Sequence, residues 1–392
     1  MSPTVRRILL VIGGPLAALL IAFVVASIVL LAVGENPFFA YQVMFERAAR
    51  ETSIVQILNK STTYFLAALA VAIGFRMNLF NIGVDGQYRL AALVAAAFAG
   101  AVSLPKPLHI LSTILIAMAV GAIWAGIAGL LKVTRGVSEV ISTIMLNAIA
   151  AGLIAWLLST DRLAVEIQGS NNIGTPIIPE SGHFPNIPTG GGELNGFIVI
   201  SVLVGILFSV ILTRTRFGYD LRATGRSETA AVASGISVKK MVLATMLLSG
   251  AVAGLVGMPQ LLGDSYTYGL DFPAGFGFTG IAIALLGRNN PIGIAFGAIL
   301  WSFLEVSGRA LDFEEIPTEI VTIMQGTIVL SVVVAYELVR RFSLRQQQRA
   351  VGRETGEADP GAGAPPPTEP PPDVTEQRES LPAGQPTGGE SR

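Results

Sequence analysis

The stretch ILLVIGGPLAALLIAFVVASIVLLAVG, residues 8–34, contains 27 consecutive residues without a charged side chain. A helix that crosses the hydrocarbon layer of a bilayer needs about 20 apolar residues, so this stretch is long enough to span it. The apolar core of a signal peptide is only about 7–15 residues long, and no small-residue cleavage pattern stands out near Glu35. We therefore interpret residues 8–34 as an uncleaved membrane helix.

The rest of the chain has the same character, because 52% of its 392 residues are hydrophobic and only 14% are charged. Typical soluble proteins have about 25% charged residues. We expect an all-α polytopic membrane protein with about ten transmembrane helices, four of them so short that they need polar flanks or a break within the membrane. The ten predicted spans are residues 8–34, 61–75, 90–105, 107–131, 140–160, 194–213, 241–263, 272–287, 289–304 and 320–336.

The positions of lysine and arginine give the orientation, because cytoplasmic loops of membrane proteins are enriched in these residues. With the N-terminus inside, the inner segments hold 20 of the 26 basic residues. An even number of spans then places both termini in the cytoplasm. The two halves of five spans would have opposite orientations, so an inverted repeat is a topological option, although the halves show no clear sequence match.

Two domains are predicted from composition. Residues 1–341 form the transmembrane domain. Residues 342–392 hold nine prolines between Pro360 and Pro386, mixed with glycine, glutamate and glutamine. Such a segment cannot bury enough apolar surface to fold, so we predict a disordered cytoplasmic tail.

Two outer segments have distinct compositions. Residues 35–60 contain an aromatic cluster before a charged run, which is typical of a short amphipathic helix on the membrane surface. The members of this cluster are Phe38, Phe39, Tyr41, Met44 and Phe45. Residues 161–193 form the longest outer loop and are rich in glycine, proline and asparagine. We expect this loop to be a cap that faces a soluble partner.

Several classes of chemistry are excluded. The chain has no cysteine, which excludes disulfides, thiolate metal sites and a cysteine nucleophile. It has two histidines, His109 and His183, for which we expect structural hydrogen bonds. No lysine follows a glycine, so the chain lacks the phosphate-binding motif G-x-x-x-x-G-K-[ST]. The G-x-G-x-x-G sequence at 275–280 follows no soluble strand, and we interpret it as close helix packing. A net charge of −1 gives no indication of a nucleic-acid partner.

A polar segment, residues 75–89, joins two of the short spans. Gly83 and Gly86 would permit a turn, and Asn81, Asp85 and Gln87 would then face a polar pathway. Polar backbone at membrane depth is tolerated only where protein or a water-filled cavity covers it. An ordinary tight inner loop explains the segment equally well.

A polar stripe follows in the fifth predicted span. Glu139, Thr143 and Asn147 are spaced four residues apart, so they lie on one face of a helix. Such a stripe should face other helices or a pore rather than lipid.

The inner loop 214–240 carries six basic residues. Within it, Ser227 is placed to cap a short helix and Gly235 to end it. The small alanines between them would let this helix approach the groove of a partner closely. A plain basic cytoplasmic loop with a surface helix is the alternative.

Five motifs extend over residues 35–340: NPFFAY at 36–41, FNIGVDGQ at 80–87, EVISTIMLN at 139–147, RATG at 222–225 with AA at 230–231 and GI at 235–236, and GIAIALLGRNNP at 280–291. Together they resemble the permeases of bacterial ATP-binding cassette (ABC) importers for nucleosides and simple sugars. This group lies within a larger one that includes the branched-chain amino acid permeases.

The resemblance implies a transporter subunit of the bacterial cell membrane rather than an enzyme, with no cofactor or metal. It implies three protein partners, namely an ATPase subunit that hydrolyses ATP on a separate chain, a second permease that is a different paralogue, and an extracellular substrate-binding lipoprotein. The 214–240 loop would dock on the ATPase. The residues that match the family's coupling motif are Arg222, Gly225, Glu228, Ala230, Ala231 and Gly235.

Three positions depart from the family pattern. Asp85 replaces the usual glutamate, Thr279 stands where many members have an acidic residue, and Arg226-Ser227 replaces Asn-Pro. These differences bear on the identity of the substrate and on which permease pairs with this one.

Three alternative functions stay open, which are a branched-chain amino acid permease, an ion-coupled secondary carrier and a membrane-embedded enzyme. The carrier would usually need a carboxylate or histidine at a span centre, and the predicted spans contain none there.

Overall fold

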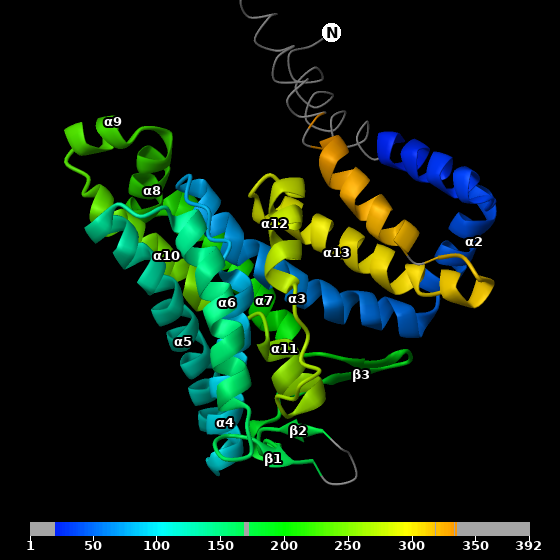
Figure 1. The fold of residues 1–392 in the computed structure, drawn as a ribbon, viewed down its shortest axis with the longest axis horizontal. Coiled ribbons are helices and arrows are strands. Elements are labelled where there is room, and N and C mark those ends of the chain that lie inside the picture. Colours follow the sequence, from blue (N-terminus) through cyan, green and yellow to red (C-terminus); the bar gives the residue numbers. More distant parts are fainter. Residues whose placement is uncertain (1–19, 168–171, 318, 333, 335–392) are drawn as a thin grey trace, which may run out of the picture. The chain divides into compact units, whose positions relative to one another are not determined.

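The helix α3 (Glu51–Arg76) lies at the centre of the part of the chain that the structure describes. The computed structural model describes residues 20–167, 172–317, 319–332 and 334, most of which are helical (Figure 1). Between Leu66 and Val71 no side chain of α3 is exposed. The sequence there is rich in alanine, which favours the helix and lets neighbouring helices approach closely.

Five of the helices that contact α3 form the bundle around it, and two more complete the bundle. The first group comprises α4 (Val84–Ala101), α7 (Phe197–Arg214), α10 (Val238–Gly254), α12 (Phe276–Leu286) and α13 (Pro291–Gly308). The second comprises α5 (Lys106–Arg135), which packs on α4 and α10, and α6 (Glu139–Leu157), which packs on α4. Helices α5, α6 and α7 keep most of their apolar surface unburied, as expected for helices that face lipid.

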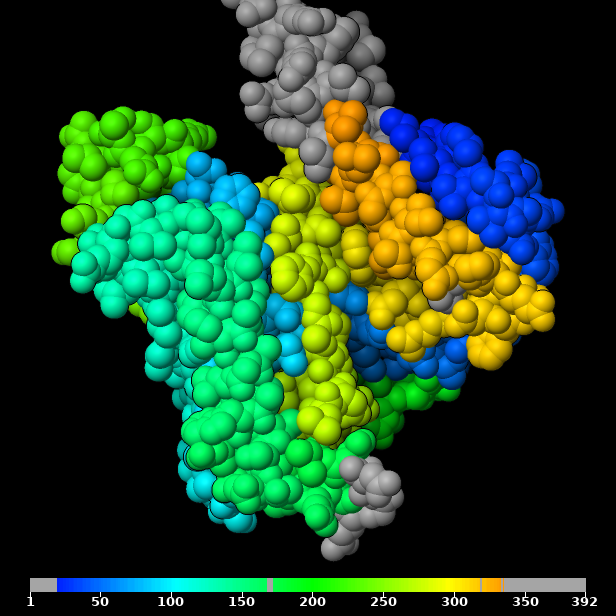
Figure 2. All heavy atoms as spheres, in the orientation of Figure 1, coloured from blue at the N-terminus to red at the C-terminus, as the bar shows by residue number. Residues whose placement is uncertain are grey.

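The remaining elements are short. Helix α2 (Pro37–Ala48) follows a helix at Leu20–Val33, and the two helices are bent by 115°. Helices α8 (Arg216–Arg226) and α9 (Glu228–Ala233) lie between α7 and α10, and α11 (Met258–Gln260) with the π-helix η2 (Leu261–Ser265) extends α10. The 3-10 helices are η1 (Glu180–Gly182) and η3 (Leu311–Glu314). Figure 2 shows the yellow α12 exposed on one face of the molecule, beside the green α6.

Among the described residues, six helices are long and apolar enough to cross a membrane, and a seventh span results if the bent pair counts as one. Each of the ten predicted spans overlaps a described helix, so the expectation of a helical membrane protein is confirmed. The ten crossings and the cytoplasmic termini stay predictions. Helix α12, with 11 residues, is only about 16 Å long at 1.5 Å per residue, which is shorter than the hydrocarbon layer.

Several helices extend past the charged residues that bounded the predicted spans, as three examples show. Helix α3 begins at Glu51 rather than at residue 61, because Lys60 is paired with Glu305 and the helix continues past it. Helix α13 likewise includes Glu305. Helix α4 begins at Val84, so the connection after α3 spans 77–83 instead of 75–89. A charge ends a hydropathic stretch in the sequence, but it does not end a helix in which it has a partner.

The all-α expectation is wrong in one detail, because the loop 161–193 contains short strands. It contains two antiparallel hairpins, β1 (Val165–Glu166) with β2 (Ile173–Gly174), and β3 (Ile187–Thr189) with β4 (Gly192–Leu194). Its glycine-rich sequence supplies the β3–β4 turn. The helix predicted in 35–60 is present as α2. The predicted tail, 342–392, lies outside the described residues.

The G-x-G-x-x-G segment packs helices closely, as predicted. A Cβ atom on Gly280 would lie 2.8 Å from the carbonyl carbon of Ala67 on α3, and one on Gly277 would lie 2.4 Å from the backbone nitrogen of Asp85 on α4. The histidines have structural contacts. His109 lies 2.9 Å from the Ser181 hydroxyl and 3.0 Å from a backbone carbonyl, and His183 stacks on Tyr266.

Candidate functional site

One buried asparagine organises the connection between α3 and α4. Asn81 is fully buried, and its Nδ2 donates to Gln87 Oε1 at 3.0 Å and to Ser249 Oγ at 2.8 Å. Its Oδ1 accepts from Gln87 Nε2 at 2.9 Å and from the Gly83 backbone at 3.1 Å. Ser249 lies on α10 and donates onward to a carbonyl of α3. The amide therefore satisfies the buried polar groups of this connection.

A second asparagine joins α4 to α6. Asn147 Oδ1 accepts from the Gly86 backbone at 2.9 Å, and its Nδ2 donates to the Ile82 carbonyl at 2.9 Å. Thr143, one turn earlier on α6, is fully buried and donates to the Glu139 carbonyl at 2.7 Å. The polar stripe of α6 thus faces neighbouring helices rather than lipid.

Asp85 connects α4 to the start of α12. Its side chain is nearly buried, and Oδ1 accepts from the Gly275 backbone at 2.7 Å. Because a side chain on Gly277 would clash with the Asp85 backbone, the two segments are in direct contact. The carboxylate therefore fixes the residues immediately before α12.

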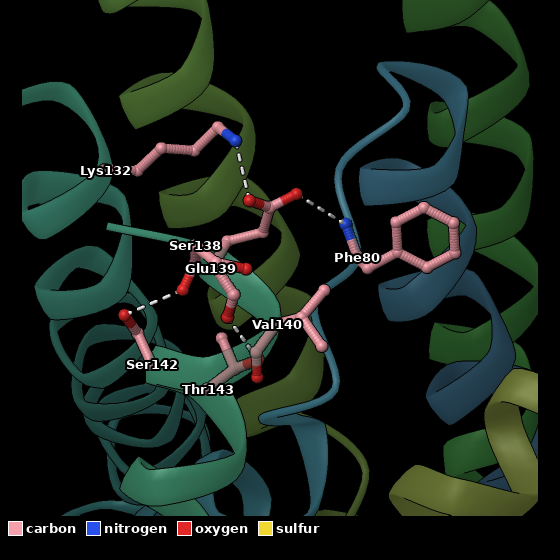
Figure 3. Close-up of polar contacts among 7 residues, drawn as sticks. All are labelled: Phe80, Lys132, Ser138, Glu139, Val140, Ser142 and Thr143. Carbon is pink, nitrogen blue, oxygen red and sulfur yellow. Dashed lines mark hydrogen bonds and ion pairs between the residues drawn. The ribbon is translucent and has the colours of Figure 1, made fainter. Parts of the chain in front are cut away.

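Glu139 is held between two elements (Figure 3). Its Oε2 accepts from Lys132 Nζ of α5 at 2.6 Å, and its Oε1 lies 3.5 Å from the backbone nitrogen of Phe80 on the opposite side. Only 9% of the Glu139 side chain is exposed. The ion pair therefore links the end of α5 to the α3–α4 connection through the first residue of α6.

Replacing Lys132 with methionine should lower the free energy of unfolding by about 2 kcal/mol, because the Glu139 carboxylate loses its charged partner while it stays buried. The double variant K132M/E139Q should recover most of this loss. Thermal denaturation of the purified protein in detergent measures both. Equal destabilisation in the single and double variants would show that the pair does not act as a unit.

The structure thus brings all six predicted pathway residues, Asn81, Asp85, Gln87, Glu139, Thr143 and Asn147, into one region around the start of α4. Each has hydrogen bonds to protein groups in this conformation. None of the six lines the cavity described next. Their contact with a transported substrate stays a prediction.

A cavity of about 800 Å³ lies at the opposite half of α3. Its walls come from the first turns of α3, the β3–β4 region, residues 259–264, the start of α12 and the end of α13. Its uncharged polar side chains are Gln56, Asn59, Thr63, Tyr64, Asn186, Asn195, Gln260 and Thr279, and its charged side chains are Lys60, Glu193, Asp264, Glu305 and Arg309.

Helices α3 and α12 touch next to the cavity. Tyr64 and Phe276 line it, and one turn further along each helix Ala67 and Gly280 are in backbone contact. Sequence analysis missed this site, because Lys60 and Glu305 were treated as the ends of spans. Two signals pointed to it, which are Thr279, a departure from the family pattern, and Gln260, an amide within an uncharged stretch.

Helices α8 and α9 lie at the other end of α3 (Figure 1). Ser227 caps α9 by accepting from the Ala230 backbone at 3.2 Å, and Gly235 follows the helix with φ +80°, so the predicted cap and end are confirmed. Ala231 is buried and Val232 is 61% exposed. A groove of about 440 Å³ separates α8 from α9 and includes Arg222, Arg226, Ala230 and Ala231 in its lining.

No group of three or more histidine, aspartate or glutamate side chains that could hold a metal ion occurs in the part of the chain that the structure describes. What the described residues contain instead is a bundle of apolar helices, a polar cavity at one end and exposed basic helices at the other. This combination defines a membrane transport protein of the permease class.

The comparisons with known proteins give the family. Residues 53–333 match the family described as "Branched-chain amino acid transport system / permease component", and the chain belongs to this family. It is 32% identical to the guanosine ABC transporter permease protein NupP of Bacillus subtilis, covering 83% of this chain and 93% of the relative. It is 30% identical to the nucleoside ABC transporter permease protein NupB of Lactococcus lactis, and the match covers 86% of this chain and 93% of the relative. It is also 30% identical to the glucose ABC transporter permease protein TsgB13 of Haloferax volcanii, and the match covers 84% of this chain and 89% of the relative. The resemblance to ABC permeases of the nucleoside and simple-sugar type is confirmed.

Proposed function

We propose that this chain is the membrane-spanning subunit of an ABC importer that moves nucleosides or simple sugars inward across a bacterial cell membrane. The observation that carries this proposal is the position of the polar cavity and of α8–α9 at opposite ends of α3. Relatives that span almost the same length are nucleoside and glucose permeases, which favours these substrates over branched-chain amino acids.

Helix α3 provides the physical link between the two ends. Lys60 and Tyr64 lie in the cavity, whereas the last residue, Arg76, contacts α8. A Cβ atom on Gly225 would lie 2.5 Å from the Arg76 carbonyl oxygen. The Arg76 guanidinium also donates to the Asn289 carbonyl at 2.7 and 3.0 Å, in the turn between α12 and α13. A displacement of α8 would therefore move both walls of the cavity.

The proposed orientation is the one that the basic residues predict. It places α8, α9 and both termini in the cytoplasm, with ten crossings and with the cavity open toward the outside. The separate ATPase would dock at the α8–α9 groove through Arg222, Gly225, Glu228, Ala230, Ala231 and Gly235. The binding lipoprotein would deliver substrate at the hairpins of 161–193, and a second, paralogous permease would complete the complex.

In this proposal the six residues around the start of α4 contact the substrate as it passes through the membrane. Asp85 accepts from the backbone of Gly275, which lines the cavity, and Asn81 lies further toward the C-terminal end of α3, where Ser249 joins it to the Ala70 carbonyl. When ATP-driven closure separates α12 from α3 and α4, Asn81, Asp85 and Asn147 would exchange their bonds with protein for bonds with the passing substrate. Polar groups at membrane depth are typical of such a pathway.

Reconstitution in proteoliposomes tests the proposed function. The complete transporter should take up nucleoside or sugar only with ATP, the ATPase subunit and the binding protein. Uptake by this chain alone, driven by an ion gradient, would contradict the proposal and favour a secondary carrier.

Replacing Gly235 with valine should separate ATP hydrolysis from transport. The residue has φ +80° and no atom near its Cβ position, so the only penalty is backbone strain of about 1–2 kcal/mol after α9. We expect uptake per ATP hydrolysed to fall about fivefold, since 1 kcal/mol is a factor of about five. Gly136, with φ +67° and equally open surroundings between α5 and α6, provides the matched control. If G136V reduces coupling as much as G235V, the effect is not specific to the docking helix.

A further inference from the structure

A charged cluster on the cavity wall has no part in the functions described so far. Glu305 on α13 accepts hydrogen bonds from the Lys60 ammonium and the Tyr64 hydroxyl, both on α3. The Arg309 guanidinium, one turn further along α13, lies 3.6 Å from the same carboxylate. All four residues line the cavity.

Such a cluster is unusual where two membrane helices meet. Charged groups in membrane segments are costly, and they usually mark a pathway or binding site. The neighbouring α3–α13 contact shows the apolar alternative, because Ile57 packs against Val306 in a small hydrophobic cluster. If the only role of this cluster were to hold α3 and α13 together, apolar side chains would stabilise the contact equally well.

The cluster retains hydrogen-bonding capacity toward the cavity. About 30% of the Glu305 side chain and 32% of the Lys60 side chain are exposed. A carboxylate has about four lone-pair positions and an ammonium has three donors, and the pair uses few of them on each other. An unused acceptor and an unused donor therefore lie side by side. Two adjacent hydroxyl groups fit this arrangement, because one donates to the carboxylate while the other accepts from the ammonium.

The surrounding charges favour a neutral ligand. Lys60 and Arg309 face three carboxylates, those of Glu305, Glu193 and Asp264. A phosphorylated ligand would meet these carboxylates, and an aliphatic amino acid would find amide side chains where it needs an apolar pocket. At the inner end Tyr64 and Phe276 pack edge to face at 5.4 Å, and Phe276 is only partly buried. This aromatic edge offers a surface for a ring.

We propose that Glu305 and Lys60 recognise a vicinal diol on a neutral ring, and that this contact determines which substrates the permease accepts. The diol belongs either to the ribose of a nucleoside or to a hexose, which share this chemistry. The proposal rests on the proposed function and goes further, because it assigns selectivity to the membrane subunit as well as to the binding protein.

The test compares substrates with and without the diol in the complete transporter in proteoliposomes. Uridine is compared with 2′-deoxyuridine, and methyl glucoside with methyl 3-deoxyglucoside, which has no two hydroxyls on adjacent carbons, each at saturating loaded binding protein. The same binding protein serves the wild type and the variants, so its own selectivity cancels in the comparison. In one of the two arms, the wild type should carry the diol substrate at least about tenfold faster, as expected for a hydrogen bond to a charged group.

The variant E305Q should reduce that ratio to within about twofold of unity. The variant E193Q, a carboxylate on the same cavity, should leave the ratio unchanged. Because E305Q leaves Lys60 unpaired, the double variant K60M/E305L removes both charges and should lose the preference as well. The arm in which the ratio collapses identifies the source of the diol.

A ratio that E305Q and K60M/E305L leave unchanged would overturn the proposal, and so would equal rates for both substrates in both arms of the wild type. Either result is distinct from failure of the proposed function, in which the wild type shows no ATP-dependent uptake at all.

Discussion

Replacing Gly121 with alanine is expected to lower the free energy of unfolding by about 3 kcal/mol, the upper end of the usual cost of overpacking. Gly121 lies where α5 crosses α10, and a Cβ atom there would lie 2.2 Å from the Gly250 carbonyl oxygen and 2.9 Å from the Gly254 nitrogen. Both are backbone atoms, so no side-chain rotation relieves the clash. The helices would have to separate along their contact.

The matched control is Gly152 on α6, where no atom lies within 4 Å of the Cβ position. The variant G152A should be neutral or more stable by up to about 1 kcal/mol, since alanine favours helix over glycine. Thermal denaturation and purification yield in detergent measure both variants. Similar stability of G121A and G152A would mean that α5 and α10 do not cross as closely as described.

The positions of the membrane helices were predictable because hydropathy is a strong, local signal. The segment 107–131 contains no charge, and α5 occupies Lys106–Arg135 around it. The boundaries were less predictable, because they depend on partners that are distant in sequence. Lys60 remains within α3 because Glu305, far along the chain, neutralises it.

The hairpins of 161–193 illustrate another limit. Their strands are only two or three residues long, too short for an alternating hydrophobic pattern to be recognised. Contacts with α3 help to hold the second hairpin. Asn59 donates to the Glu193 carbonyl at 3.0 Å, and its Oδ1 accepts from the Asn195 backbone at 2.8 Å. Such contacts cannot be read from a single sequence.

One part of the candidate site could be predicted from the sequence and the other could not. Four-residue spacing correctly grouped Glu139, Thr143 and Asn147 on one face of α6. The cavity, in contrast, combines side chains from five separate segments, and its charged members looked like loop residues. Spacing within one helix is visible in the sequence, whereas convergence of several helices on one space requires the fold.

The two polar regions together suggest how access could alternate. Polar groups line an open cavity beside the first half of α3, whereas the polar groups around the start of α4 are paired with one another. A substrate that enters the second region must replace those hydrogen bonds. In the proposed pathway, the strength of these hydrogen bonds would contribute to the barrier to transport in the absence of ATP.

Replacing Asn81 with alanine should show this directly, with a loss of about 3–5 kcal/mol in the free energy of unfolding. The substitution leaves buried groups of Gln87, Gly83 and Ser249 without their partner, and each unsatisfied buried group costs about 1–3 kcal/mol. The control is Q42A, because the Gln42 amide donates to Glu46 on the exposed face of α2. This variant should change the stability by less than about 0.5 kcal/mol.

Thermal denaturation of N81A and Q42A in detergent is combined with ATP hydrolysis by the complete transporter in the absence of substrate. If the network helps to keep the pathway closed, N81A should be less stable and should also hydrolyse more ATP without substrate. Normal stability with a raised KM for uptake would instead show that Asn81 serves only to contact substrate. The two outcomes separate a residue that holds the closed state together from one that merely lines the route.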